Sequence, residues 1–513
     1  ASEVVASGIP RKNICIEFIS KIVSSQNPVC LIAYFCISSP GTCNRLIYIC
    51  SLECFKNEGC SEIRLSKVTL EQIKAPIPNA IAMGPFGSRI KTDNFVPTGV
   101  PVIRGGNLNA SRLLDDEFVY LTEEKADELR TSNARPGDIV ITHRGTIGQV
   151  GIIPYSARHP RYVVSQSQMK FTVDPEKADP FFIFYFLRSP VGQHQLLANT
   201  SQVGVPAIAQ PTSSLKTIEI LLPSTVDEQR AIAHILGTLD DKIELNRRMN
   251  ETLEAIAQAI FKSWFVDFDP VRAKAQGEPP ESICRRLRLT PDLLALFPDR
   301  LVDSELGEIP EGWEMGTIAD HCILNAVSWT AKMLPAKVYY VDLANAKNGI
   351  ISEIQVFSSS AAPSRARRVL RAGDTIVGTV RPGNRSFALI GQGTPQLTGS
   401  TGFAVLSPTR NELREFVYYL ATNDNNISRL NQLADGAAYP AVRSEVVTAG
   451  VCVLPPPDVI DAFHVATAEM VDYQIANRVN NDTLATIRDT LLPELLSGEL
   501  RMLSHDQAVE VVA

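Results

Sequence analysis

The sequence has little positive charge to offer an anionic partner. Lys and Arg number 49 against 56 Asp and Glu, which gives a formal net charge of −7 over 513 residues. Because a protein that grips phosphates alone needs clustered Lys and Arg, this balance argues against a free-standing nucleic-acid binder. It leaves room for local basic clefts, and for a subunit whose partners supply much of the phosphate contact.

Long apolar runs are also missing. The longest, such as Val29 to Cys36, fall far short of the roughly 20 residues that span a bilayer. The sequence has no twin-Arg signal and no convincing secretory peptide. We therefore expect a cytoplasmic protein that makes no membrane contact.

Catalytic signatures are absent from the sequence. There is no Gly-x-x-x-x-Gly-Lys-[Ser/Thr] loop, no Gly-x-Ser-x-Gly elbow, and no Asn-Pro-Pro-[Tyr/Phe] motif, with which amino-methyltransferases hold the target amine. The seven His residues are scattered without metal-ligand spacing. Asp267 and Asp269 could suggest a metal pair, but a turn beside Pro270 is favoured because no third ligand is evident. We expect a non-catalytic chain that itself binds no metal and no cofactor.

Cysteine is concentrated at the start of the chain. Seven of the ten Cys lie in the first sixty residues, with no Cys-x-x-Cys pair and no His among them. A structural zinc site is therefore not expected, and a disulfide framework would need an oxidising compartment that nothing else indicates. We interpret residues 1–60 as a Cys-rich extension outside the functional fold, foreign to it or weakly structured.

A repeated motif is the most informative feature that is present. Asn-Arg-x-x-Asn-[Glu/Asp]-Thr-Leu begins at Asn246 and again at Asn477, 231 residues later. An Arg-x-Gly-Asp sequence likewise starts at both Arg135 and Arg371. Two similar halves in one chain suit a target that also comes in two parts.

Each half has a globular part of mixed character. Short apolar runs between Gly and Pro turns predict a loop-rich domain of short strands over residues 61–225. Within it, Pro180 to Arg188 is interpreted as a buried helix that faces the sheet, in preference to a stacking platform for bases. A second domain of the same plan is expected over 307–456, after a polar, Pro-containing linker or strap over 271–306 with a short helical patch from Pro291 to Leu296.

A long amphipathic helix follows each domain, over 226–270 and over 457–503, before a tail at 504–513. Neither heptad seam is apolar enough to stabilise a long helix alone, so we predict an α+β fold in which the two helices pair as an antiparallel coiled coil with a pseudo-two-fold axis. At ~1.5 Å per residue, such a rod approaches ~60 Å. Asn at the seam can fix register by pairing with Asn of the other helix, whereas the alternative is that these residues cap turns or face solvent. The predicted pairing residues are Leu239, Ile243, Asn246, Asn250, Leu253, Asn477, Asn481 and Leu484.

Several short segments, in their order and duplication, resemble one family: the specificity (S) subunits of Type I restriction–modification systems. Asp227 to Ala233, Leu239 to Ile243 and Ile260 to Val271 resemble its conserved helical region. The segments similar to its target recognition domains are Gly84 to Ser88, Val102 to Asn107 and Arg135 to Asp138. The second domain departs from this pattern, with Asn325 to Thr330 in place of Gly-Pro-Phe-Gly-Ser and Asp342 in place of Arg104.

The resemblance implies a DNA-recognition subunit without catalytic activity of its own. Two target recognition domains would each read half of a split, asymmetric sequence in double-stranded DNA. The helices would set the unread spacer and dock two modification (M) subunits, which bind S-adenosylmethionine and methylate adenine. Two restriction (R) subunits would then join and use ATP and Mg²⁺ to translocate and cut unmodified DNA, as in phage defence.

Loop side chains that can reach base edges and phosphates are the remaining chemistry. Gly84, Gly87, Gly105, Gly106 and Gly145 would let the backbone approach DNA closely, and His143 could reach a phosphate. For each candidate, the alternative is an ordinary solvated side chain or a turn residue. The candidates are Ser88, Arg89, Lys91, Arg104, Asn107, Arg144, Gln166, Gln168 and Lys170 in the first domain, and Lys332, Asn345, Lys347, Arg381, Asn384, Arg385, Ser400, Tyr439 and Arg443 in the second.

Two other functions stay open at this point. One is an orphan methyltransferase or nuclease component, against which the missing methyltransferase motif argues. The other is a scaffold that binds only proteins, which the acidic charge balance favours.

Overall fold

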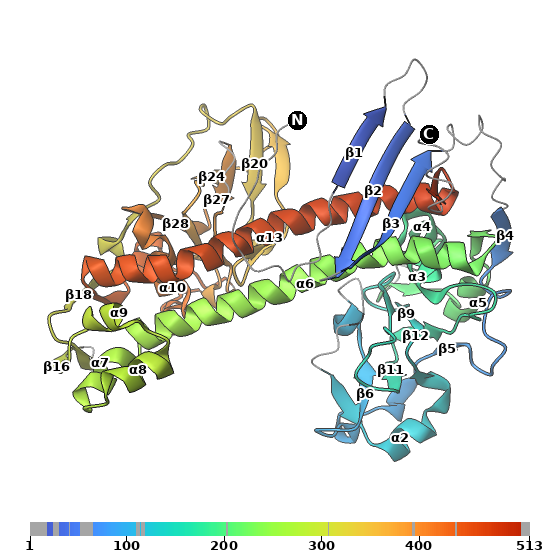
Figure 1. Cartoon of the computed structure of the whole chain (residues 1–513), viewed down its shortest axis with the longest axis horizontal. Coiled ribbons are helices and arrows are strands. Elements are labelled where there is room, and N and C mark those ends of the chain that lie inside the picture. Colours follow the sequence, from blue (N-terminus) through green and yellow to red (C-terminus); the bar gives the residue numbers. More distant parts are fainter. Residues whose placement is uncertain are drawn as a thin grey trace. The chain divides into compact units, whose positions relative to one another are not determined.

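Figure 1 shows the computed structural model of the chain. It describes residues 18–23, 30–39, 42–51, 65–108, 113, 118–201, 204–305, 307–391, 396–436 and 439–503, without the side chains of Ser88, of 501–503 and of the strands before residue 64. The chain divides into two units, residues 1–243 with 482–513, and residues 244–481. Each unit contains one globular domain of helices and strands and a part of both long helices, which confirms the predicted α+β class.

Two four-stranded sheets form the domain of the first unit. The first is antiparallel with the order β10-β9-β12-β5, and the second has the order β7-β6-β11-β8 with β6 and β11 parallel. The strands are β10 (Val150–Ile152), β9 (Ile139–Thr142), β12 (Gln168–Phe171), β5 (Ile81–Met83), β7 (Val119–Leu121), β6 (Val100–Ile103), β11 (Tyr162–Val164) and β8 (Asn133–Ala134).

Strand β9 is buried on both faces because it lies between two cores. Ile139 and Ile141 belong to the cluster that contains helix α3 (Pro180–Arg188), whereas Val140 belongs to the cluster of the second sheet. Successive residues of a strand point to opposite faces, so the run Ile-Val-Ile supplies both cores at once. The aromatic side chains of α3 face the first sheet, with Phe182, Ile183 and Phe184 fully buried.

The rest of this domain connects the sheets to the long helix. Strand β4 (Leu65–Thr69) pairs with β15 (Glu219–Pro223), and β13 (Thr200–Ser201) pairs with β14 (Ala207–Ile208). The helices are α2 (Glu123–Glu128), α4 (Pro190–Leu197) and α5 (Pro211–Lys216). The 3-10 turns are η1 (Gly87–Arg89), η2 (Thr92–Asn94), η3 (Gly105–Leu108) and η4 (Arg130–Ser132).

The domain of the second unit repeats this topology strand for strand. Its sheets have the orders β26-β25-β28-β19 and β23-β20-β27-β24, and β20 and β27 are the parallel pair. The strands are β26 (Phe387–Leu389), β25 (Thr375–Gly378), β28 (Phe403–Pro408), β19 (Cys322–Leu324), β23 (Gln355–Ser358), β20 (Lys337–Val341), β27 (Leu397–Ser400) and β24 (Ala366–Val369). The other elements are β18 (Glu314–Thr317) paired with β29 (Val451–Leu454), β21 (Ala346–Lys347) with β22 (Ile350–Ile351), α10 (Arg414–Thr422), α11 (Asp424–Gln432), α12 (Ser444–Thr448), η5 (Ile318–Asp320), η6 (Leu343–Asn345), η7 (Pro382–Asn384) and η8 (Asn411–Leu413).

The long helices α6 (Val226–Phe265) and α13 (Pro457–Ser497) pair antiparallel, as predicted. In the second unit, Asn246 Nδ2 donates to Asn481 Oδ1 at 2.8 Å, and Asn477 Nδ2 donates to Asn250 Oδ1 at 2.8 Å. The first Asn of each motif thus bonds the second Asn of the other, which is a local two-fold arrangement. In the first unit, Arg488 pairs with Asp240 at 2.6 Å.

Replacing Asn477 by Leu should destabilise the second unit. Asn477 is buried, and its loss leaves the Asn250 carbonyl oxygen without its donor, at a cost of about 1–3 kcal/mol. The double variant Asn250→Leu/Asn477→Leu removes both polar groups and should recover most of that stability. Urea unfolding of both variants and of Asn250→Leu gives the coupling energy; strictly additive effects would contradict the pairing.

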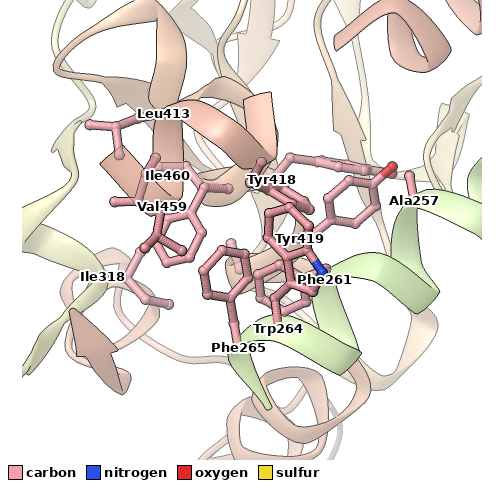
Figure 2. Close-up of a cluster of buried hydrophobic side chains, with 14 of the residues drawn as sticks. Ala257, Phe261, Trp264, Phe265, Ile318, Leu413, Tyr418, Tyr419, Val459 and Ile460 are labelled. Atoms are coloured by element: carbon pink, nitrogen blue, oxygen red, sulfur yellow. The ribbon is translucent and has the colours of Figure 1, made fainter. Parts of the chain in front are cut away.

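The aromatic end of α6 is the centre of the second unit's core (Figure 2). Phe261, Trp264 and Phe265 are buried there, and the rings of Phe265 and Phe463 of α13 lie 5.2 Å apart edge to face. Tyr419 of α10 completes the contact, with its ring 5.9 Å from Phe261. This cluster joins the end of one long helix to the start of the other and to the domain.

The segment predicted to be a linker or strap contains folded elements. They are α7 (Asp269–Ala275), α8 (Pro280–Leu287), α9 (Pro291–Ala295), and the hairpin of β16 (Leu301–Ser304) and β17 (Gly307–Pro310). Val271, Ile283, Leu294 and Phe297 of this segment are buried in the same core as Trp264. The carboxylates of Asp267 and Asp269 are engaged locally, by Lys262 and Ser263 respectively.

Part of the Cys-rich start forms strands. β1 (Phe18–Val23), β2 (Cys30–Ser39) and β3 (Thr42–Ser51) form an antiparallel sheet whose last strand is β30 (Leu500–Leu503), directly after α13. That residues 1–60 lie outside the functional fold stays a prediction. Among the helices the structure describes, none is long and apolar enough to cross a membrane.

Candidate nucleic-acid interface

A cleft of about 450 Å³, the first cleft, lies in the first domain where the loops after β6, β9 and β11 meet. Strands β6 and β11 are parallel, so their carboxyl ends reach the same edge, and the chain then enters β12 beside the end of β9. Four predicted residues line this cleft: Arg104, Arg144, Gln166 and Gln168.

The first cleft has basic walls. Arg104 and Arg144 are exposed, and neither forms an ion pair with a carboxylate in the part of the chain that the structure describes. No Asp or Glu is among the residues that line the cleft. The Arg104 guanidinium carbon lies 5.0 Å from the centre of the Phe95 ring, a cation–π contact. An anion that enters this cleft meets two cations without a competing carboxylate.

Hydrogen bonds hold the loops of the first cleft together. Gln168 Nε2 donates to Thr142 Oγ1 at 3.3 Å, Thr142 Oγ1 donates to Gln149 Oε1 at 3.0 Å, and Gln149 Nε2 donates to the Gly105 carbonyl at 3.3 Å. The loops also pack closely at Gly84, where a Cβ atom would lie 1.8 Å from the Ser165 carbonyl oxygen. Glycine is therefore required at this position, and the cleft is rigid at its base.

Three predicted contact residues lie inside the fold instead of facing a cleft. Asn107 accepts a hydrogen bond from the Arg104 amide at 2.9 Å and shapes the turn that carries Arg104. Lys170 Nζ lies 4.0 Å from Asp138, and burial lowers the pKa of Lys170 while it raises the pKa of Asp138. Ser400 is buried and accepts from the Gly402 amide at 3.3 Å. We leave these three out of the proposed contact set because a buried group cannot reach DNA without opening the domain.

His143 is buried beside Arg144. Burial lowers the pKa of His143, and the neighbouring Arg144 cation adds to that effect. A neutral, buried imidazole is a poor phosphate ligand, so His143 is also left out.

The second cleft, of about 1130 Å³, lies in the second domain at the equivalent place. Of the predicted residues, Lys347, Arg381, Asn384, Arg385 and Tyr439 line it. Arg385 is held by Asp424 at 2.6 Å and by Asn348 at 3.0 Å.

The second cleft also contains Asp342 and Arg365, which are not among the predicted contact residues. Asp342 caps the turn η6 by accepting from the Leu343 amide at 2.7 Å. Arg365 is exposed directly before β24, whose first residue, Ala366, is buried. The alternation of an exposed Arg with a buried Ala at a strand start is the one signal that could have identified it.

The remaining predicted residues lie outside both clefts. Arg89 and Lys91 are exposed on and after η1, Lys332 is exposed between β19 and β20, and Arg443 is exposed ahead of α12. The Asn345 amide lies 3.4 Å from Glu353. The side chain of Ser88 lies outside the described residues. DNA contact by any of these six stays a prediction.

Backbone hydrogen bonds show which residues of the two clefts are equivalent. The Gly145 amide donates to the Pro206 carbonyl at 2.9 Å, and the Arg381 amide donates to the Pro440 carbonyl at 2.7 Å. At the other wall, the amides of Asn107 and Asn345 donate to the carbonyls of Arg104 and Asp342, respectively. Arg381 therefore occupies the place of Gly145, and Asp342 occupies the place of Arg104. We call this shared backbone arrangement of the loops around each cleft the frame. Its two copies carry different side chains.

Comparison with known proteins gives this frame a family. Residues 86–255 match the family model described as the Type I restriction modification DNA specificity domain. The HindI specificity subunit of a Type I restriction enzyme from Haemophilus influenzae is 26% identical over 380 residues, which cover 66% of this chain and 81% of that protein. The MjaIX specificity subunit from Methanocaldococcus jannaschii is 24% identical over 402 residues, which cover 76% of this chain and 85% of that protein. The chain is thus similar to Type I specificity subunits over 66% to 76% of its length.

The fold agrees with this similarity. A crystal structure of the S subunit of a Type I restriction–modification system from M. genitalium superimposes with a TM-score of 0.51 at 16% identity, covering 85% of this chain and 97% of that one. The resemblance predicted from the sequence is thus confirmed. The matched residues 86–255 include every lining residue of the first cleft except Pro85, and more than half of α6.

Proposed function

We propose that the chain is the DNA sequence-recognition subunit of a Type I restriction–modification complex, and that each cleft reads one half of a bipartite, asymmetric DNA site. The observation that carries this proposal is the duplicated frame: two clefts with exposed arginines occupy equivalent places but differ in side chains. Two equal frames with unequal linings suit a target whose halves differ in sequence. The helices α6 and α13 would set the unread spacer.

The chemistry of the clefts suits base edges and phosphates. Arg104, Arg144 and Gln166 in the first cleft, and Lys347, Arg365 and Arg381 in the second, offer the donors that such contacts need. The net charge of −7 is compatible with this role if partner subunits supply part of the phosphate contact.

Those partners, we propose, are two M subunits, which bring S-adenosylmethionine, and two R subunits, which bring ATP and Mg²⁺. An exposed apolar stripe on α6 supports docking of a protein partner. Leu245, Met249 and Ile256 are 44%, 36% and 42% exposed, and their spacing places them on one face of the helix. Burial of such an apolar stripe by a partner protein removes it from water and therefore stabilises the complex.

Placing two acidic residues on this stripe should remove M-subunit binding. Leu245→Asp with Met249→Asp introduces charge where a partner would bury apolar surface, and affinity should fall at least about 100-fold. Ala255→Asp with Gln258→Asp, exposed on another face of the same helix, is the matched control and should bind normally. Binding is measured by titration calorimetry after circular dichroism has verified the helix content. Equal binding by both variants would place the partner elsewhere.

Selection from random DNA tests the function itself. The chain assembled with its M subunits should enrich a sequence of two specified parts separated by unspecified bases of fixed length. One contiguous motif, or no motif, would overturn the proposal. Methyl transfer by the isolated chain would favour an enzyme instead, and protein binding without any DNA selection would favour a scaffold.

A further inference from the structure

In each cleft, one arginine is stacked on an aromatic ring that also lines the cleft. Arg385 of the second cleft lies over Phe387 as well, at 5.4 Å, but this ring does not line the cleft, and Asp424 holds the Arg385 guanidinium. The Arg104 guanidinium carbon lies 5.0 Å from the ring centre of Phe95, and that of Arg381 lies 4.8 Å from the ring centre of Tyr439. All four residues line their cleft. Stacking restricts the plane of a guanidinium, so its forked edge is presented in a limited set of directions before any ligand arrives.

The two stacked arginines come from different loops of the same frame. Arg104 follows β6, where the second domain has Asp342; Arg381 lies in the loop after β25, where the first domain has Gly145. The aromatic partners differ as well, because Tyr439 takes the place of Val205 directly before the equivalent prolines. The stacked pair has therefore changed its position between the two copies.

The backbone at Arg381 is in a conformation that is costly for a residue with a side chain. Arg381 has φ +47°, in the left-handed region that favours glycine, and its counterpart Gly145 has φ +87°. A side chain at this position costs conformational free energy that glycine would not. The Tyr439 ring, which is 71% exposed, covers little besides the arginine. Neither residue is explained by packing of the domain core.

We propose, on the basis of the proposed function, that Arg104 and Arg381 are specificity-determining residues, each reading the guanine of one G·C pair in the major groove. A guanidinium of fixed plane can donate two parallel hydrogen bonds to guanine O6 and N7, an arrangement that no other base offers. Because the two arginines stand on non-equivalent loops, the G·C pairs occupy different positions within their half-sites. Arg365 lines the second cleft without a ring contact among the described residues, and it contacts phosphate.

The test is selection from random DNA by the full chain assembled with its M subunits. Arg381→Lys should relax preference at one G·C position of one half-site by roughly 10- to 100-fold and leave the other half-site unchanged. Arg104→Lys should do the same in the other half-site, at a different position within it. Tyr439→Leu should weaken discrimination at the position that Arg381 reads, and Tyr439→Phe should restore it because the ring is kept.

The control variant is Arg371→Lys, exposed in the same domain but outside the cleft, which should leave every base preference intact. A uniform loss of affinity in Arg381→Lys without a change of preferred sequence would show a phosphate contact and overturn the inference. An unchanged preference in either Arg→Lys variant would overturn it for that arginine, while a bipartite preference of the unmodified assembly would still support the proposed function. If that assembly selects no bipartite sequence, the proposed function fails as well.

Discussion

Replacing Trp264 by alanine should lower the free energy of unfolding by about 3–5 kcal/mol, the cost of removing a large aromatic side chain from a packed core. Trp264 is 3% exposed, and its ring lies 5.3 Å from Phe297 of the segment after α9 and 5.9 Å from Phe463 of α13. The change removes ring contacts to both of these segments at once. We expect a lower midpoint of urea unfolding, measured by circular dichroism and by the fluorescence of the two remaining tryptophans, Trp329 and Trp313, the second of which lies in the same core.

Val266 provides the control for this prediction. It lies two residues further along the chain and is 38% exposed, so Val266→Ala should change stability by less than about 0.5 kcal/mol. If Trp264→Ala were equally mild, the cluster at the end of α6 would not be the centre of the core.

Reversing the charge of both arginines of the first cleft should have the largest effect on DNA binding. Arg104→Glu with Arg144→Glu replaces two cations by two anions where the lining has no carboxylate. Affinity for the cognate site should fall by at least about 100-fold, and the slope of log affinity against log salt should drop by roughly 2 if both arginines had displaced counterions. Binding is measured by fluorescence anisotropy at several salt concentrations, with the M subunits present.

Arg130 and Arg135 allow a matched control. Both are exposed in the same domain and lie outside the cleft, so Arg130→Glu with Arg135→Glu changes the net charge by the same amount. This variant should lose only the weak, long-range part of the attraction. If the two double variants bind equally well, the first cleft does not contact DNA.

The sequence alone was sufficient for the architecture because its signals are local and duplicated. The Asn-Arg-x-x-Asn motif marks both long helices. The apolar run Ile139 to Ile141 indicates a strand regardless of where that strand lies in the tertiary structure. The segment after α6 shows where such signals mislead. Pro270 and Pro280 look like breaks in a linker, but each stands in the first turn of a short helix, where its missing amide costs nothing. The short helical patch predicted from Pro291 is α9.

The site was harder to predict than the fold because a side chain can contact DNA only if it is exposed, and exposure is set by the tertiary structure. Lys170 and Arg144 are both basic residues, and the sequence does not tell them apart. Lys170 is buried on a strand with both faces covered, whereas Arg144 is exposed after the end of a strand. Nor does a sequence show that the Phe95 ring lies against the Arg104 guanidinium, since eight residues, among them strand β6, separate the two. Such contacts are set by tertiary packing, which pattern and spacing do not encode.

The asparagine bonds between α6 and α13 have a consequence for self-association. Asn246 bonds Asn481, the counterpart of Asn250, so two copies of one half could satisfy these amides as well as the two halves of one chain do. The Arg488–Asp240 pair has no such symmetry, because the residue of α6 that corresponds to Arg488 in the repeat is Ala257. Two copies of the first half would place a methyl group where Arg488 stands and leave the buried Asp240 carboxylate with only the Tyr185 hydroxyl at 2.8 Å and Arg188 at 4.0 Å. Loss of its nearest cation is costly for a buried charge. The Arg488–Asp240 ion pair thus disfavours a homodimer of the first half and favours the pairing of the two different halves of the chain.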